Sequence, residues 1–411
     1  MTAGDALARL VREEGTRVLA TLVRVTGSVD LAEDAVQDAA VRALQTWPRD
    51  GVPDNPRAWL LVTAKRRAID IIRRETRRAG KEADAMALSD PTPEPPETVR
   101  DDLLRLVFTC CHPSLSPEAQ VALALRTLGG LSTQEVARGL MVPEATMAKR
   151  LTRARQKIAQ AGIPFRVPAA EDLPGRLATV AATVYLIFNE GYAPGAGADL
   201  VRGELTAEAV RLARLLAELM PDEPTVLGLL ALLLLHDARR AARTDDHGQP
   251  VLLTDQDRTR WNQGMIKEGV ELLGTALRRT PDRPDVYVVQ AAIAACHALA
   301  PSYTDTPWDA VISWYDVLLT VHDTPIVRLN RAAAVAERDG PDAGLELVDA
   351  IGGLEHYAWW HASRAELLQR TGRPQAAQAA YQRAVALGMS RPQTEHLRRR
   401  ITGLSQEDRP L

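Results

Sequence analysis

Arginine and lysine side chains crowd two segments of this 411-residue chain, and their chemistry is the binding of anions. From Arg57 to Lys81, nine basic residues stand against Asp70 and Glu75, a local charge of +7 in a chain whose net charge is −3. Trp59 adds a flat ring on which a nucleic-acid base could stack. This density favours nucleic acid as the anion. A solvated surface helix with arginines for solubility is the alternative from this segment alone.

The second basic segment, from Thr146 to Ile158, has two distinct faces if it forms a helix. Thr146, Lys149, Arg150 and Arg153 recur at i, i+3, i+4 and i+7, and apolar residues take the opposite side: Met147, Leu151, Ala154 and Ile158. Arginine and lysine on such a face reach either guanine edges or phosphates. Residue type does not distinguish these two kinds of contact.

Three helices must position the first basic segment. The segment Pro56–Arg78 has a proline in its first turn, no further Gly or Pro, and an apolar face at helical spacing: Leu61, Ala64, Ala68 and Ile71 or Ile72. Helices are also predicted over 6–25 and 30–47. Asp30 is the expected N-cap of the second, with Glu33 as its capping-box partner. That helix is expected to bury Leu31, Ala35, Val36, Ala39 and Leu44, and to expose Glu33, Asp34, Gln37, Asp38 and Arg42.

The second basic segment closes a predicted helix-turn-helix. Ser116, Pro117 and Glu118 start a first helix, which Gly129 and Gly130 end. Ser132 and Glu135 form a capping box for a short second helix, and Pro143 is placed as the first residue of the third. In this arrangement the second helix of the pair enters the major groove of DNA.

These motifs carry a resemblance to a known family. The sequence EDAVQ, a loop, and then PRAWLLVTAKRRAIDIIRR resembles domain 2 of the extracytoplasmic-function (ECF) sigma factors of bacterial RNA polymerase, and the helix-turn-helix ending in LTRARQKI is similar to their domain 4. The resemblance implies that Glu33, Asp34, Gln37 and Arg42 contact core RNA polymerase. It implies −10 promoter DNA contacts by Trp59, Lys65, Arg66, Arg67, Asp70, Arg73 and Arg74. It implies −35 contacts by Thr146, Lys149, Arg150, Arg153 and Arg155.

Between the two motifs, residues 82–100 are acidic and rich in proline, which is typical of an extended linker. A simple tether is one interpretation. The resemblance implies another, in which the linker threads the polymerase cleft.

The C-terminal half is predicted to be helical throughout and shows an internal repeat. In RAELLQRTGRPQAAQAAYQRAVALG, the small and aromatic positions resemble a tetratricopeptide (TPR) repeat: Ala365, Gly372, Ala377, Tyr381 and Ala384. Weaker copies place Ala209, Ala213, Leu216 and Pro221 at the spacing of Gly269, Leu273, Ala276 and Pro281. Such helix pairs stack into a superhelix because none buries its faces alone. Gly191 is expected to stop the first helix of this half.

Composition argues against other classes of protein. Cys110, Cys111 and Cys296 give no disulfide framework, the N-terminal residues form an amphipathic helix instead of a signal peptide, and the apolar run 226–235 is too short to span a bilayer. A cytoplasmic protein is therefore expected. Zinc at Cys110, Cys111 and His112 is disfavoured because adjacent cysteines suit a zinc site poorly. The polar stretch 239–257, with Asp245, Asp246, His247, Asp255 and Asp257, is interpreted as a loop in preference to a metal or hydrolytic site.

The predicted fold class is all-α. Residues 1–81 form sigma domain 2, 82–100 a linker, 101–162 sigma domain 4, and 163–411 a TPR-like regulatory domain. The expected partners are core RNA polymerase, promoter DNA and, at the C-terminal domain, a regulatory protein. No catalytic residue, cofactor or metal is expected. The alternative function is a helix-turn-helix regulator with a TPR sensor that does not join polymerase.

Overall fold

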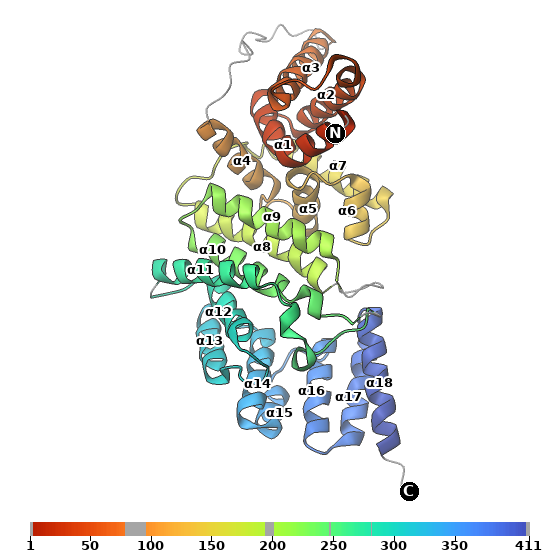
Figure 1. Cartoon of the computed structure of the whole chain (residues 1–411), viewed down its shortest axis with the longest axis vertical. Helices are drawn as coiled ribbons and strands as arrows, with labels where there is room; N and C mark the ends of the chain where they lie inside the picture. Colours follow the sequence, from red (N-terminus) through yellow and green to blue (C-terminus); the bar gives the residue numbers. More distant parts are fainter. Residues whose placement is uncertain (1–2, 79–95, 194–200, 246–247, 281, 408–411) are drawn as a thin grey trace. The chain divides into compact units, whose positions relative to one another are not determined.

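The computed structural model describes residues 3–78, 96–193, 201–245, 248–280 and 282–407, and every extended regular element in these ranges is a helix (Figure 1). Within them, β-pairing is confined to an isolated bridge between Thr244 and Pro250. The predicted all-α class is confirmed. It follows from a composition rich in alanine, leucine and arginine and with 4% aromatic residues. The chain divides into two compact units, Met1–Val184 and Tyr185–Leu411.

The first unit opens with a bundle of three helices, α1 (Ala3–Thr26), α2 (Val29–Asp50) and α3 (Pro56–Arg78) (Figure 1). The predicted bounds of α3 are confirmed. Its buried row is Leu60, Ala64 and Ala68, so Leu60 takes the place predicted for Leu61, which is half-buried together with Ile71 and Ile72. The facing row on α2 is also small: Ala32, Ala35, Ala39 and Ala43 are all buried. These short side chains let the two helices lie close together.

Helix α2 differs from its prediction at both ends. Its N-cap is Ser28, whose hydroxyl accepts a hydrogen bond from the backbone N–H of Leu31 at 3.3 Å, so Asp30 is not the cap. The helix continues through Pro48 to Asp50, and Gly51 closes it at φ +85°, a conformation that glycine adopts readily. Leu44 was expected to be buried and is 51% exposed. Glu33 was expected to be exposed and is buried.

The rest of the first unit holds α4 (Pro96–Cys110), α5 (Pro117–Leu123), a π-helix (Ala124–Leu128), α6 (Thr133–Gly139) and α7 (Glu144–Gln160). Because α4 begins at Pro96, residues 96–100 are helical and do not belong to an extended linker. Residues 82–95 of the predicted linker lie outside the described part of the chain.

The N-terminal half of α8 (Leu173–Tyr192) completes the first unit. The guanidinium of Arg176 donates to the backbone carbonyl of Phe108 at 2.5 Å and lies over the Phe108 ring. The hydroxyl of Thr183 donates to Oε1 of the buried Gln120 at 3.1 Å. The Gln120 amide in turn donates to the carbonyls of His112 and Leu115. Residues of α8 therefore cap the interior of the helix-turn-helix domain.

The second unit is a succession of packed helices (Figure 1). They are α9 (Gly203–Leu219), α10 (Pro224–Asp237), α11 (Gln263–Arg279), α12 (Val286–Leu299), α13 (Trp308–Val321), α14 (Pro325–Asp339), α15 (Pro341–Asp349), α16 (Ala358–Arg370), α17 (Pro374–Leu387) and α18 (Arg391–Glu407). Single 3₁₀ turns cover 240–242, 253–255 and 258–260. Helix α10 is apolar on every side and nearly all of it is buried, because α9, α11 and α12 all pack against it.

Helices α16 and α17 form the pair that the clearest repeat predicted. Ala365, Ala377, Tyr381 and Ala384 are all buried, and Gly372 between the helices has φ +72°. The Tyr381 hydroxyl donates to Glu366 at 2.8 Å. In the weaker copies Ala209, Ala213, Leu216, Leu273 and Ala276 are buried as well, while Pro281 lies outside the described residues. The predicted packing positions within these helices are thus confirmed, whereas Pro221 and Gly372, which lie between helices, are exposed.

Gly191 does not stop α8, which continues to Tyr192. A Cβ atom at Gly191 would lie 2.7 Å from the backbone nitrogen of Thr206 and 2.9 Å from the carbonyl oxygen of Arg202. The glycine is therefore required by the close approach of the chain at the start of α9. The sequence indicated that this position is special, but not the reason.

Among the described residues, no helix combines the length and the apolar character needed to cross a bilayer.

Candidate nucleic-acid interface

The exposed face of α7 borders a groove of about 490 Å³. Four predicted side chains line it: Thr146, Lys149, Arg150 and Arg153. Lys157, one turn further on, adds a positive charge that the sequence prediction missed, and Ser114 and Ser116 contribute hydroxyls. Of the residues that the structure shows around this groove, none is acidic. The groove therefore concentrates positive potential beside hydrogen-bond donors, which suits the phosphates and base edges of DNA.

Helix caps hold this groove in shape. The Ser116 hydroxyl accepts from the backbone N–H of Ala119, and the predicted capping box is present, with Ser132 and Glu135 exchanging bonds of 2.7 and 3.1 Å. The backbone amide and the hydroxyl of Ser132 lower the pKa of Glu135. Pro143, predicted as the first helical residue, is instead the N-cap of α7, and the helix begins one position later at Glu144. Met147, Leu151 and Ala154 are buried beneath the basic face as predicted, while Ile158 is half-buried.

Helix α3 presents the other predicted basic surface. Arg66, Asp70, Arg73 and Arg74 are exposed, and Lys65 and Arg67 are half-buried. Arg67 forms an ion pair with Asp38 of α2, so its charge is partly neutralised in this conformation. Arg57 lies 3.5 Å from Glu14 of α1. The side chains beyond Arg74 in this helix lie outside the described set.

Trp59 does not stand free on this surface. Its ring packs edge-on against Trp47 of α2, with the ring centroids 5.4 Å apart, and belongs to a small apolar cluster with Leu7 and Ala43. The ring is half-buried. Part of it remains accessible to a base, and the rest fixes α3 to α2.

The predicted polymerase-binding residues divide between two sides of α2. Asp34, Gln37 and Arg42 are exposed on α2, and so are two apolar residues of the same helix, Val41 (52% exposed) and Leu44 (51% exposed). An exposed face that mixes apolar and charged side chains is typical of a protein-binding surface. Glu33 lies on the opposite side and is 8% exposed.

Glu33 is enclosed by the helix-turn-helix domain. Its carboxylate accepts from Arg155 of α7 at 2.6 Å and from the Thr127 hydroxyl at 3.2 Å, and Arg126 lies 3.7 Å away. Arg155 also pairs with Asp30 at 3.1 Å. Arg155, predicted to bind −35 DNA, thus points away from the α7 groove. The structure brings together Glu33 and Arg155, two residues assigned to different partners.

Two further contacts join the three-helix bundle to the helix-turn-helix domain. Arg24 of α1 donates to the fully buried carboxylate of Asp102 in α4 at 2.9 Å. The hydroxyl of Thr16 donates to the carbonyl of Leu128 at 3.0 Å. Asp102 and Thr127 escaped the sequence prediction because a single acidic or hydroxyl residue in a helix carries no signal of a distant partner.

Cys110 and Cys111 are buried at the C-terminal end of α4. Burial raises the pKa of the Cys110 thiol well above its ordinary value and that of Cys111 to about 12. Burial, and then the charge of Arg176, lowers the pKa of His112. Both cysteines are therefore protonated packing residues at neutral pH.

Comparison with known proteins supports the assignment of the two halves of the first unit. Residues 10–78 match the family described as sigma-70 region 2, and residues 105–158 match sigma-70, region 4. Residues 176–277 match a family of unknown function, DUF6596.

The chain is 42% identical over 400 residues to "Uncharacterized protein R00370" of Rhizobium meliloti (strain 1021), covering 95% of this chain and 94% of the relative. It is 30% identical over 154 residues to "Probable ECF RNA polymerase sigma factor SigI" of Mycobacterium tuberculosis (strain CDC 1551 / Oshkosh). This second match covers 36% of this chain and 52% of SigI, so the chain spans about half the length of that relative.

Among solved structures, yeast Tom70 aligns with 98% of this chain and 88% of its own at 11% identity, with a TM-score of 0.30, too low to assign a fold. The chain shares nearly its whole length with R00370 and has sigma regions 2 and 4 in the family's order, followed by a further helical domain. The chain is also 32% identical over 156 residues to "ECF RNA polymerase sigma factor SigK" of Mycobacterium sp. (strain KMS) and covers 78% of that relative. It belongs to the ECF sigma factors.

Proposed function

We propose that this sigma factor binds core RNA polymerase through the outer face of α2 and promoter DNA through the basic faces of α3 and α7. Asp34, Gln37 and Arg42 would contact polymerase. The α3 surface from Lys65 to Arg74 would hold melted −10 DNA, and the α7 groove would bind the −35 element. The family acts by binding and not by catalysis. Its site of action would be the cytoplasm, where polymerase and the chromosome are found.

The observation that carries this proposal is the basic groove beside α7. Helix α7 belongs to sigma region 4, which follows sigma region 2 in this chain as it does in the family. Three arginine and lysine side chains predicted from spacing alone share this groove: Lys149, Arg150 and Arg153. We assign residues 1–81 to sigma domain 2, 82–95 to the connection, 96–162 to sigma domain 4 and 163–411 to a domain that modulates activity.

The contact of Glu33 with Arg155 adds a regulatory step to the proposal. In this conformation the ion pair holds the two DNA-binding regions together. Glu33 is then not available to polymerase, and Arg155 is not available to −35 DNA. Polymerase and DNA would bind an open form in which this contact is broken. The C-terminal domain would then act by changing the balance between the closed and the open form.

Reconstituted run-off transcription on genomic fragments tests the proposal. Wild-type protein and core polymerase should start transcription at defined sites. If Arg150 contacts a base, Arg150→Ala should weaken the binding of −35 DNA by roughly 1–3 kcal/mol. If it contacts a phosphate, the slope of log K against log salt concentration should become shallower by about one. Arg383→Gln, which changes an exposed arginine on α17, is the matched control and should leave transcription unchanged.

Gel filtration with core polymerase separates the proposal from the alternative function. Wild-type protein should co-elute with core, and Asp34→Ala should co-elute less while it stays folded. A protein that binds DNA but never co-elutes with core would instead be a helix-turn-helix regulator outside the transcription complex.

A further inference from the structure

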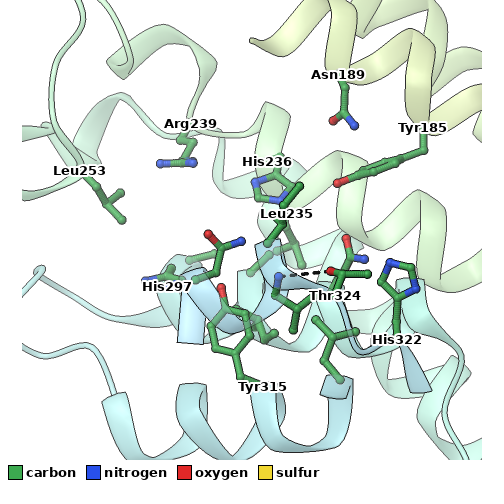
Figure 2. A pocket seen from close by; sticks show the side chains of 18 of the residues that line it. Tyr185, Asn189, Leu235, His236, Arg239, Leu253, His297, Tyr315, His322 and Thr324 are labelled. Carbon is green, nitrogen blue, oxygen red and sulfur yellow. Dashed lines mark hydrogen bonds between the residues drawn. The ribbon is translucent and has the colours of Figure 1, made fainter. Parts of the chain in front are cut away.

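A cavity of about 730 Å³ lies in the second unit, built by residues of the C-terminal half of α8, of α10, α12, α13 and α14, and of the segments between helices, which supply Arg239, Trp261 and Tyr357 (Figure 2). None of its lining residues belongs to the surfaces proposed for DNA or polymerase. Sites for small organic molecules typically measure between about 300 and 1,000 Å³. The cavity is therefore large enough for a metabolite-sized ligand.

The lining of this cavity has an uneven chemistry. Arg239 supplies a positive charge, three histidines, His236, His297 and His322, supply ring nitrogens that can form hydrogen bonds, and no aspartate or glutamate is among the residues that the structure places around the cavity. Four aromatic residues supply flat apolar walls: Tyr185, Trp261, Tyr315 and Tyr357. Figure 2 shows Arg239 and His297 towards one side of the cavity and His322 towards the other. The cavity thus has a cationic side and an aromatic body.

The charge of Arg239 is not neutralised within the described residues. Its guanidinium has no hydrogen-bond or ion-pair partner there and lies 5.7 Å from the centroid of the Tyr192 ring. Burial, and then the charge of Arg239, lowers the pKa of Arg258 nearby, although Asp305 opposes this effect. Arg258 itself donates to the carbonyls of His297 and Ala300, so its hydrogen bonds hold the end of α12. Arg239 is the guanidinium left available to a ligand.

The two inner histidines are neutral at physiological pH. Burial, and then Arg239 and further cationic neighbours, lowers the pKa of His236 to about 3 and that of His297 to about 4. Nδ1 of His297 is buried and has no hydrogen-bond partner in the described structure. A buried polar atom of this kind is costly unless a ligand or water satisfies it. His297 therefore offers a hydrogen bond beside the Arg239 charge.

The cavity has a buried floor and an accessible rim. Trp261 on its wall is 4% exposed, whereas His322, Ile326 and Asn330 are exposed. A ligand can therefore enter past the start of α14 and reach the cationic side. We propose that this cavity binds a small organic anion, with its carboxylate or phosphate paired with Arg239 and its flat apolar body against the tyrosines and Trp261.

Calorimetric titration and thermal denaturation of the full chain at constant ionic strength test the inference, with benzoate, phenyl phosphate and the neutral benzamide as probes. At least one of the two anions should bind with a Kd of about 10 mM or tighter and raise the melting temperature. Benzamide, which has the same ring without the charge, should bind at least about 10-fold more weakly. Binding by benzoate alone identifies a carboxylate site, and binding by phenyl phosphate alone identifies a phosphate site.

Variants locate the binding. Arg239→Gln should weaken anion binding by about 10-fold or more, Arg239→Lys should retain part of it, and Arg383→Gln should bind like the wild type. Circular dichroism establishes that each variant is folded, and the comparison of benzoate with benzamide needs no variant at all. The inference is overturned if neither anion binds, if benzamide binds as well as the anions, or if folded Arg239→Gln binds them unchanged. No polymerase or DNA is present, so the result is independent of the proposed function.

Discussion

At the scale of single residues, Glu33 shows how one carboxylate can serve a different partner from the one that its helix indicates. The pattern of α2 placed it on an exposed face, and in the structure it is buried between Arg155, Arg126 and Thr127. A buried carboxylate needs such partners because desolvation of an unpaired charge costs several kcal/mol. Glu33 therefore ties the three-helix bundle to the helix-turn-helix domain.

Arg155→Ala should lower the free energy of unfolding of the first unit by roughly 2–3 kcal/mol, because it leaves the buried carboxylate of Glu33 without its closest cation. Glu33→Gln should cost less, since the amide keeps a hydrogen-bond acceptor. Denaturant unfolding of both variants and of the double variant gives their coupling energy, expected between about 0.5 and 3 kcal/mol. Arg150→Ala on the same helix, in the groove, should change stability by less than about 0.5 kcal/mol. Additive effects of the two substitutions would show that the contact is not formed in solution.

His236 predicts a loss of stability in acid. Its pKa is about 3 in the folded chain and about 6.5 when unfolded, so the unfolded state binds the proton more readily. The contribution of the neutral His236 side chain to the free energy of unfolding is complete above pH 6.5 and is lost as the pH falls towards 3. Between pH 7 and 5 the second unit should lose about 2 kcal/mol through this group.

Thermal or urea unfolding of the wild type and of His236→Gln at both pH values measures this effect. The free energy of unfolding of the wild type, relative to that of His236→Gln, should be about 2 kcal/mol lower at pH 5 than at pH 7. His356→Gln, at an exposed histidine, is the control. A gap that stays constant with pH would mean that His236 is not buried as a neutral group.

At the scale of helices, local signals predicted some caps and spans correctly, but the predicted Asp30 cap and the predicted stop at Gly191 were wrong, and helix interruptions were not predicted. Ser132 with Glu135, and the span Pro56–Arg78, were predicted from local signals and are present. The π-helix Ala124–Leu128 was not predicted, because ALRTL carries no residue that distinguishes it from an ordinary helical turn. Arg126 and Thr127, which reach Glu33, both come from it. The junction in the first unit therefore depends on an element that sequence patterns do not reveal.

Glycines in the second unit should respond to substitution with opposite signs. A Cβ at Gly344 of α15 would lie 2.3 Å from the Cβ of Ala336 in α14, so Gly344→Ala should destabilise the chain by about 1–3 kcal/mol. At Gly274 of α11 the nearest atom would be the flexible end of Arg278 at 3.4 Å, so Gly274→Ala should stabilise it by about 0.5–1 kcal/mol. Chemical denaturation of the two variants in parallel measures both values. Equal changes would contradict the close contact of α14 with α15.

At the scale of the whole molecule, the helix-turn-helix domain needs residues beyond the sigma motif. Arg176 lies over the Phe108 ring and donates to its carbonyl, and Thr183 donates to Gln120. Both residues follow position 160, near which a minimal sigma unit would end. A fragment of residues 1–184 should therefore melt several degrees higher than a fragment of residues 1–160. Differential scanning calorimetry of both fragments measures the difference, and the double substitution of Arg176→Ala and Thr183→Ala in the longer one should abolish most of it. Identical melting of the two fragments would show that α8 adds nothing to this domain.

Local sequence patterns predicted the helical class, the helix-turn-helix and the small residues of the α16–α17 pair. Each depends on spacing within one or two helices. The cavity beside Arg239 could not be predicted, because its lining comes from positions as distant as Tyr185 and Tyr357, and none of them forms a motif. Likewise the partner of Arg155 lies 122 positions away in sequence. What sequence reasoning missed is long-range pairing, which only the packed chain defines.

The junction of Glu33 with Arg155 has a consequence for how the two proposed binding events relate to each other. Suppose that polymerase and −35 DNA both bind the form in which this ion pair is broken. The partner that binds first then supplies the free energy needed to separate the pair, and the second partner binds a protein that is already open. Thermodynamic linkage then requires that polymerase raise the affinity for −35 DNA by the same factor by which −35 DNA raises the affinity for polymerase. A variant that already lacks the ion pair should show less of this mutual reinforcement, even though none of its groove residues has changed.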